Sequence, residues 1–362
     1  MMRRPLAAAA LAIVAAFAAP IALGKGPSGP SRALLSDNPP ATLAATLLFL
    51  DAQARVPAPG VTPYALNMAL YSDGAAKRRY VYVPQGASAT YDANEAFAFP
   101  IGSVLIKTFA MPLDARAPGG GERLLETRLL VRRADGWTAL PYVWNDAGDD
   151  ARLSLIGAQL SVSAIDARGQ TQTIAWQAPN KNQCKGCHSL DGAFTPIGPK
   201  ARNLNGDYIY DGGRENQLTH WSRKGLLTGA PAADAAPRAP AIDDQNAPLA
   251  AKARAYLDVN CAHCHRPGGP ADTSGLDLSW SQSDPMRWGV EKRPVAAGRA
   301  SANLAFDIAP GAPDRSILVH RMASVDPGVM MPEVGRSLVD AEGLQLIRSW
   351  IADMGPNGEP RR

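Results

Sequence analysis

The chain has 362 residues, a length typical of two or three domains. Its 37 Lys and Arg against 33 Asp and Glu leave a formal net charge of only +4, which gives no reason to expect binding to nucleic acid. The sequence holds four cysteines, and all four fall in two short motifs of the same pattern.

The N-terminus has the pattern of a cleavable export signal. Arg3 and Arg4 precede an apolar run over residues 6–17, and Ala22-Leu23-Gly24 fits a small-x-small cleavage site. A transmembrane anchor is the competing interpretation, but Pro20 interrupts the run, which is short for a span. We therefore expect the first 24 residues (1–24) to be a signal peptide, and the mature protein to be periplasmic without stable membrane insertion.

Residues 25–178 are expected to form a β-rich domain. Their first part is rich in Pro, Ala and Leu, with one short helix near 42–51, and period-two alternation such as Leu160, Val162 and Ala164 then predicts strands. Several short strands separated by turns favour a sandwich-like domain. The expected strands cover residues 79–83, 104–111, 123–132, 138–144, 159–165 and 171–176.

The stretch Cys184-Lys185-Gly186-Cys187-His188 follows this domain, and Cys261-Ala262-His263-Cys264-His265 repeats its pattern. Cys-x-x-Cys-His is the attachment signature of c-type haem. In a helical turn the sulfurs at i and i+3 face one way and can both bond one porphyrin, and the histidine at i+4 can bind its iron. The pairs are farther apart in the sequence than in common zinc motifs, although the fold could still bring them together, and a thioredoxin-like pair needs no adjacent histidine.

The motifs therefore predict two covalently bound haem c groups. Cys184, Cys187, Cys261 and Cys264 would form the thioether bonds, and His188 and His265 would be the proximal iron ligands.

The two motifs have unequal surroundings. Residues 179–229 form a short first haem segment that we expect to pack on the β-rich domain, and the Ala- and Pro-rich residues 230–247 indicate a linker. Within residues 248–362, a helix over 249–260 leads into the second motif, and a second helix over 341–354 follows it. The expected fold class is multidomain α+β, with an N-terminal β-sandwich-like domain, the first haem segment packed on it, and a C-terminal all-α cytochrome c-like domain.

A methionine loop is the expected source of the sixth ligand of the second haem. Met330-Met331-Pro332 lies between the motif and the closing helix, and thioether sulfur is a common axial ligand. Met331 is favoured as this ligand, and Met330 and Met322 are the alternatives. Packing in an apolar core would account for these methionines without any role at the iron.

The first haem lacks such a loop, because no methionine lies between His188 and Cys261. His220 is the candidate sixth ligand there, and Met111, Met68 or an open iron are the alternatives. Lys200 and Arg202 are candidate partners of haem propionates, and solvated surface charge is an equal explanation. His263, inside the second motif, is expected at the surface.

Longer stretches carry a resemblance beyond the motifs. They are Phe99 to Phe109, Leu125 to Leu130, Tyr142 to Asp146, Asn180 to Gln183 and Pro196 to Lys200. Together they resemble a family of bacterial exported dihaem c-type cytochromes whose physiological role is unassigned, over most of the chain after about residue 60. The resemblance implies haem ligation by His188 and His265 and a cytochrome c-like C-terminal domain, and it supplies no substrate. Glu333 departs from the commoner Met-Pro-Pro form of the loop, which leaves Met330 and Met331 both open.

Two haems in one exported chain indicate one-electron chemistry. The expected function is that of a periplasmic electron carrier, or of an electron-accepting subunit of an unidentified dehydrogenase, with a redox protein as partner. The alternatives are a dihaem peroxidase-like enzyme and a haem gas sensor, and both need an open iron at the first haem. No catalytic side chain is assigned.

Overall fold

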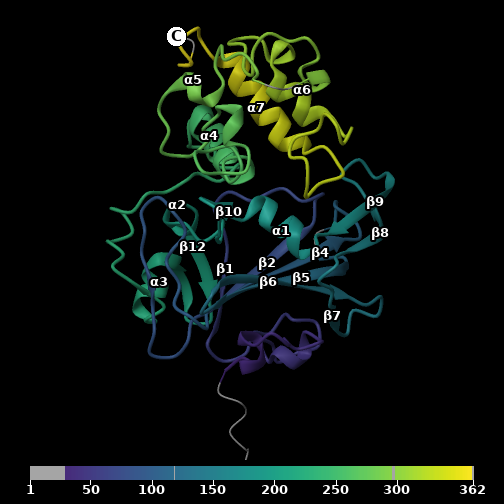
Figure 1. Cartoon of the computed structure of the whole chain (residues 1–362), viewed down its shortest axis with the longest axis vertical. Helices are drawn as coiled ribbons and strands as arrows, with labels where there is room; N and C mark the ends of the chain where they lie inside the picture. The colour runs from purple at the N-terminus through teal and green to yellow at the C-terminus, as the bar shows by residue number, and fades with distance from the viewer. Residues whose placement is uncertain (1–28, 118, 296–297, 361–362) are drawn as a thin grey trace, which may run out of the picture.

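The structure is a computed structural model that describes residues 29–117, 119–295 and 298–360 (Figure 1). The expected signal peptide lies outside the described residues. Within the described ranges, no helix has both the length and the apolar character needed to cross a membrane.

A six-stranded antiparallel sheet forms the centre of the N-terminal half. Its strand order is β1-β2-β4-β5-β6-β7, so neighbours in the sheet follow one another in the chain, with only the short β3 left out. Its strands are β1 (Val61–Tyr64), β2 (Ala76–Tyr82), β4 (Val104–Pro112), β5 (Glu122–Arg133), β6 (Gly136–Trp144) and β7 (Ala151–Leu153). The first four expected strands all fall within this sheet.

The two faces of this sheet pack against different parts of the chain. Tyr80, Ile106 and Leu129 belong to the cluster that packs on the N-terminal segment, which lies below the sheet in Figure 1. Their neighbours Val81 and Leu105 point the other way, because successive side chains on a strand alternate between faces, and they join a separate apolar cluster. The second face is the one that carries the first motif.

In the described ranges, four small two-stranded sheets lie around the central one. The hairpin of β8 (Ala158–Ile165) and β9 (Thr171–Ala178) confirms the last two expected strands, and it packs through Val162, Ile174 and Trp176 on Phe109. The others pair β3 (Ala89–Thr90) with β14 (Leu227–Thr228), β10 (Ser189–Leu190) with β11 (Ala193–Phe194), and β12 (Asp207–Tyr210) with β13 (Gly213–Asn216).

The helices are short. They are α1 (Lys181–Cys187), α2 (Ala201–Leu204), α3 (Gln217–Arg223), α4 (Leu249–Asn260), α5 (Pro285–Trp288), α6 (Ile317–Ala323) and α7 (Ala341–Asp353). Single 3-10 turns occur at η1 (Arg32–Leu35), η2 (Ala44–Thr46), η3 (Asp272–Ser274), η4 (Gly298–Ser301) and η5 (Pro313–Arg315).

The expected fold class was wrong. The described chain is β-rich, with one six-stranded sheet and several small sheets, and no second sheet of comparable size forms a sandwich with the first within the described residues. The part of residues 248–362 that the structure describes is also not an all-α cytochrome c-like domain. Only α4 and α7 exceed seven residues there, and isolated parallel bridges at Val290–Ile308 and Phe306–Ser316 tie its long loops together. Frequent proline and glycine between α4 and α7 prevent longer helices, because proline removes a helical hydrogen bond and glycine lowers helix propensity.

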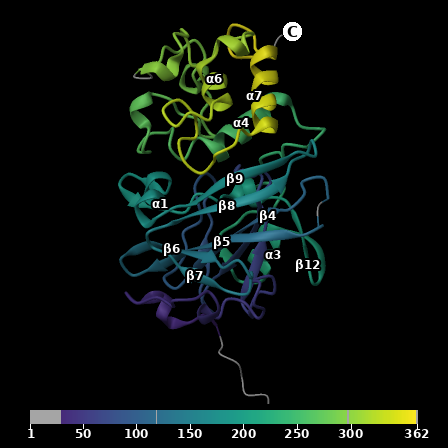
Figure 2. The ribbon, with the colours of Figure 1, turned by 90° about the vertical axis from the view of Figure 1, so that its right-hand side faces the viewer.

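The helices α4 to α7 lie at one end of the molecule, with α1, α2 and β10 between them and the central sheet (Figure 1; Figure 2 shows the side view). A buried ion pair joins the layers: Arg202 of α2 donates from Nε and Nη2 to both carboxylate oxygens of Asp258 in α4, at 2.8 Å each. Asp73, from the loop before β2, accepts from the backbone N–H groups of Ser337 and Leu338 at 2.8 Å. The first motif, the sheet and the C-terminal helices are therefore held against one another.

Candidate functional site

Helix α1 presents the cysteines of the first motif. Asn180 and Gln183 form a capping box, in which each side chain accepts from the backbone N–H of the other residue. This box starts the helix one turn before Cys184, so Cys184 and Cys187 lie on one face of it. The four cysteines of the chain, all within the described residues, are free thiols. Burial raises the pKa of the Cys184 thiol.

His188 ends this helix and is held in one orientation. Its Nδ1 lies 2.8 Å from the carbonyl oxygen of Thr195, and its ring stacks on Phe194 with centroids 5.3 Å apart. A carbonyl only accepts, so Nδ1 carries the proton and Nε2 keeps its lone pair. Burial lowers the pKa of His188 to about 4, which keeps the ring neutral near pH 7. Among the described residues Nε2 has no hydrogen-bond partner, so it is available to a metal.

His265 in the second motif has the same arrangement from different residues. Its Nδ1 lies 3.0 Å from Ser274 Oγ, and that hydroxyl donates in turn to the carbonyl oxygen of Ala271 at 2.7 Å. Because the hydroxyl proton is used there, Ser274 must accept from Nδ1–H, which again leaves Nε2 with its lone pair. Burial, and then the nearby Arg321, lower the pKa of His265 to about 4.

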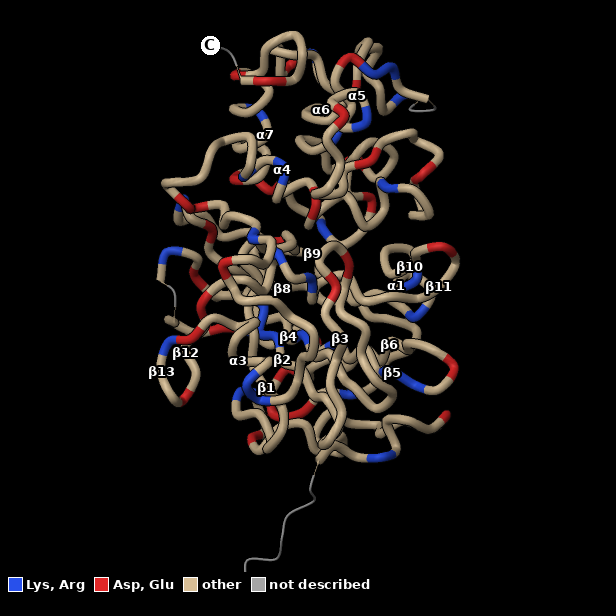
Figure 3. Tube along the Cα trace, turned by 90° about the vertical axis from the view of Figure 1, so that its left-hand side faces the viewer, with Lys and Arg blue, Asp and Glu red and all other residues tan. Residues whose placement is uncertain are grey.

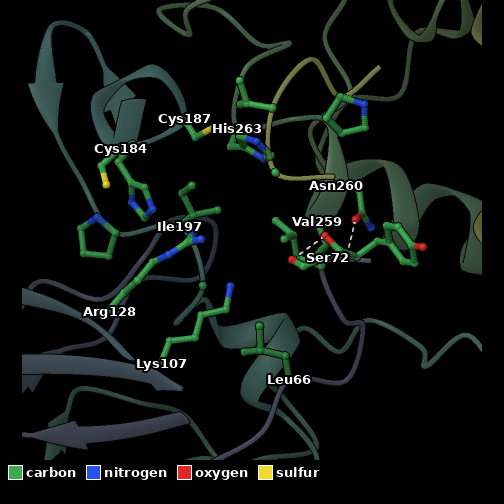
Figure 4. A pocket seen from close by; sticks show the side chains of 18 of the residues that line it. Leu66, Ser72, Lys107, Arg128, Cys184, Cys187, Ile197, Val259, Asn260 and His263 are labelled. Carbon is green, nitrogen blue, oxygen red and sulfur yellow. Dashed lines mark hydrogen bonds between the residues drawn. The ribbon is translucent and has the colours of Figure 1, made fainter. Parts of the chain in front are cut away.

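The two motifs lie against each other, although they are far apart in the sequence. Ligand atoms of Cys187, His263 and Cys264 all lie within 4.8 Å of one another. Figure 4 shows Cys187 and His263 side by side at one end of a cavity. A hydrogen bond from Cys264 lowers the pKa of Cys187 to about 4, and the same contact raises the pKa of Cys264.

His263 is not the surface residue that the sequence suggested. It is half-buried, it lines the cavity, and its Nδ1 is buried with no hydrogen-bond partner in the described structure. Two thiols and one imidazole are also a donor set that zinc accepts, so metal content has to be measured in any test of the site.

A large cavity opens beside the first motif. Its empty space, counted together with the solvent open to it, is about 1930 Å³. Cys184, Cys187 and His188 line it from the first motif, whereas Cys261, Cys264 and His265 are not among its lining residues. The two thiols and the oriented imidazole of the first motif therefore face one cavity.

The methionine loop reaches the same cavity. Met331 and Met322 line it, and Met330 is buried elsewhere, at 8 % exposure. Arg336 fixes the loop, because its Nη2 donates to the carbonyl oxygens of Met331 at 2.9 Å and Ser324 at 2.8 Å. The structure thus brings Met331 to the cavity that the first motif lines, and the role of Arg336 had no signal in the sequence.

His220 lies away from the cavity. Its Nδ1 is 2.6 Å from Glu215, and its ring stacks on Tyr210 with centroids 3.5 Å apart. The alternative ligands Met68 and Met111 are buried in apolar clusters and do not line the cavity. The structure therefore does not bring these three residues together with the first motif.

The two candidate propionate partners are both engaged by acidic residues. Arg202 pairs with Asp258, as described above, and both side chains are 3 % exposed. Lys200 lines the cavity, and its Nζ lies 3.4 Å from Glu95.

Comparisons with known proteins give no match. No protein-family model matches the chain, and neither a curated protein nor a solved structure does.

Proposed function

We propose that the chain is a dihaem c-type cytochrome that transfers electrons one at a time, as a periplasmic carrier or as the electron-accepting subunit of a dehydrogenase. One observation carries this proposal. In both motifs, two free thiols precede a histidine whose Nδ1 is held by an oxygen and whose Nε2 has no hydrogen-bond partner among the described residues. An oriented imidazole of this kind is the usual state of a metal-ligating histidine.

Each motif would hold one group through its own residues. Cys184 and Cys187 would bond the first and Cys261 and Cys264 the second, with His188 and His265 on the irons. Haem iron supplies one-electron oxidation and reduction when it is bound in this way. The chain's own contribution is to keep both imidazoles neutral and in one tautomer, since burial lowers both pKa values to about 4.

The contact between the motifs supports electron exchange within the chain. The attachment sulfurs Cys187 and Cys264 lie within 4.8 Å of each other, so the two groups would be bonded at neighbouring points. Two redox groups attached next to each other could exchange electrons, which agrees with a role as a carrier or an electron-accepting subunit.

Met331 is the proposed sixth ligand of the second iron. Because it lines the cavity next to the first motif, Met331→Ala has to be examined at both haems. Loss of the sulfur-to-iron near-infrared band, together with a fall in the potential of one haem, identifies the iron that it serves.

The test of the function is a haem and metal count on the purified full-length protein. Two haems per chain are expected, and the paired variants Cys184→Ser/Cys187→Ser and Cys261→Ser/Cys264→Ser should each retain one. Fewer than two haems in the parent protein, or stoichiometric zinc in their place, would overturn the proposal. Carbon monoxide binding to the ferrous protein separates a carrier, in which both irons are six-coordinate, from a gas sensor or a peroxidase with an open iron.

A further inference from the structure

Three basic residues stand in a row across the central sheet. Arg79 of β2 lies opposite Lys107 of β4, and Lys107 lies opposite Arg128 of β5. Residues directly opposite in an antiparallel sheet point to the same face, so the three side chains are neighbours. All three line the cavity, and Figure 4 shows Lys107 and Arg128 pointing into it.

This cation row interrupts an apolar face. On one side of it Val81, Leu105 and Leu130 pack in one cluster, and on the other side Phe109 and Trp176 pack in another. Figure 3 shows the blue of Lys and Arg along β2 and β4 in the middle of the sheet. Like charges placed directly opposite each other destabilise a sheet, so the fold alone gives no reason for the row.

Within the part of the chain that the structure describes, only one of the three cations has an acidic partner. Arg128 donates from Nε to Glu126 Oε2 at 3.0 Å, and Glu126 is fully buried and also accepts from Trp176. The Arg79 side chain is 9 % exposed, has no hydrogen bond or ion pair within the described residues, and its Nη2 is buried without a partner. Lys107 makes no ion pair there and lies over the Phe109 ring, 4.7 Å from its centroid.

Arg79, which is buried, and Lys107, which is half-buried, therefore lack an acidic partner among the described residues. An uncompensated buried charge is costly, and the usual remedies are an acidic partner or neutralisation. Burial, followed by the charges of Arg79, Arg128 and Lys77, holds the pKa of Lys107 well below its ordinary value.

We propose that Arg79, Lys107 and Arg128 form an anion site that binds carboxylate groups in the cavity. Guanidinium and ammonium groups form their strongest hydrogen bonds with such anions, and a planar guanidinium matches a carboxylate with two parallel bonds.

The carboxylates can come from two sources. One is the pair of propionates of a haem on the first motif, since Cys184, Cys187 and His188 line the same cavity, and this source rests on the proposed function. The other is a small free dicarboxylate that enters the cavity beside that haem. The row would then be part of a substrate or effector site.

The experiment uses the full-length protein as purified, with the variants Arg79→Gln and Lys107→Met. Lys224→Met is the matched control, because Lys224 is exposed at the end of α3 and does not line the cavity. The potentials of both haems are measured by redox titration, with and without succinate as the probe. If Arg79→Gln does not fold, Lys107→Met still tests the site, because the Lys107→Met change removes a charge that has no acidic partner.

The two sources give different results. If propionates occupy the site, both variants lower the potential of one haem, because loss of a nearby cation favours ferric iron, and succinate has no effect on the parent protein. If a free dicarboxylate occupies it, succinate shifts the parent potential saturably, and each variant weakens that binding at least tenfold, or about 1.4 kcal/mol.

Variants that match Lys224→Met in both potentials, together with no succinate effect on the parent, would overturn the anion site. A protein that purifies without haem contradicts the proposed function instead. Calorimetric titration of that protein with succinate then tests the row by itself, and absence of binding counts against it.

Discussion

The buried pair of Arg202 and Asp258 offers a strict test of how the two motifs are held together. Arg202 belongs to α2, which follows the first motif, and Asp258 belongs to α4, which leads into the second. Two bonds of 2.8 Å join them, and both side chains are 3 % exposed. We consider the changes Arg202→Met, Asp258→Leu and the two combined.

The magnitudes follow from the burial of this pair. Arg202→Met leaves the Asp258 carboxylate buried, and the one donor that remains to it among the described residues is the backbone N–H of Trp280 at 3.0 Å. Removing one member of a buried ion pair costs about 3–5 kcal/mol of unfolding free energy, because the remaining charge is uncompensated. The double variant removes both charges and should therefore be more stable than either single variant.

Urea unfolding of the full-length protein measures these differences. Arg348→Met is the control, because Arg348 pairs at 2.8 Å with Asp314, whose side chain is 80 % exposed, and such surface pairs contribute about 0–1 kcal/mol. Single variants that lose less than the control, or a double variant that loses the sum of the singles, would refute the assignment of a buried, coupled pair.

Three further changes test the surroundings of the motifs. Ser274→Ala removes the acceptor of His265 Nδ1–H and should shift the potential of one haem only. Loss of such an outer hydrogen bond weakens metal ligation about 10–100-fold. If neither haem potential shifted, Ser274 would not have this role. The pKa of Lys77 is lowered to about 7, mainly by burial, so between pH 7 and about 10.5 the unfolded chain binds more protons and stability rises with pH. Lys77→Met should flatten that rise in urea unfolding curves, and an unchanged slope would show that Lys77 is not its source. Arg336→Met removes the hydrogen bond to the Met331 carbonyl and should lower the unfolding free energy by about 1.5–3 kcal/mol, measured by urea unfolding. It should also weaken the near-infrared sulfur-to-iron band. An unchanged band would mean that the methionine loop keeps its position without Arg336.

The strands could be predicted from the sequence, but the way they assemble could not. Alternation at Leu160, Val162 and Ala164 correctly gave β8, where Val162 and Ala164 are buried. Alternation says which side chains share a face and nothing about which sheet a strand joins. Several short strands separated by turns therefore suggested a sandwich-like domain, whereas the β8–β9 hairpin pairs with no strand of the central sheet.

The same limit explains the error in the C-terminal part. The helix before Cys261 was expected over 249–260 and is α4 (Leu249–Asn260), and Asp340 caps α7 by accepting from the N–H of Gly343. Helices with a cap and an apolar stripe are local features. The loops between them are set by distant contacts, such as those of Arg336 and Asp73, which no local pattern contains.

The candidate site also has one part that the sequence predicts and another that only the fold reveals. The spacing within each motif was visible in the sequence, because attachment needs cysteines at i and i+3 and a histidine next to them. The contact of Cys187 with Cys264 was not visible, because it depends on how α1 packs against the loop after α4. Ser274, which holds His265, is one serine among many until the fold places it 3.0 Å from the ring.

The cation row is where the register of the sheet matters most. In the sequence Arg79, Lys107 and Arg128 are three ordinary basic residues on three expected strands, and each could face solvent. A shift of one residue in either pairing would send a side chain to the opposite face and break the row. The observed register instead places all three on the cavity side, two of them without a counter-ion among the described residues. A buried charge without a partner lowers the stability of the fold, so the row is best explained by an anion that the cavity receives.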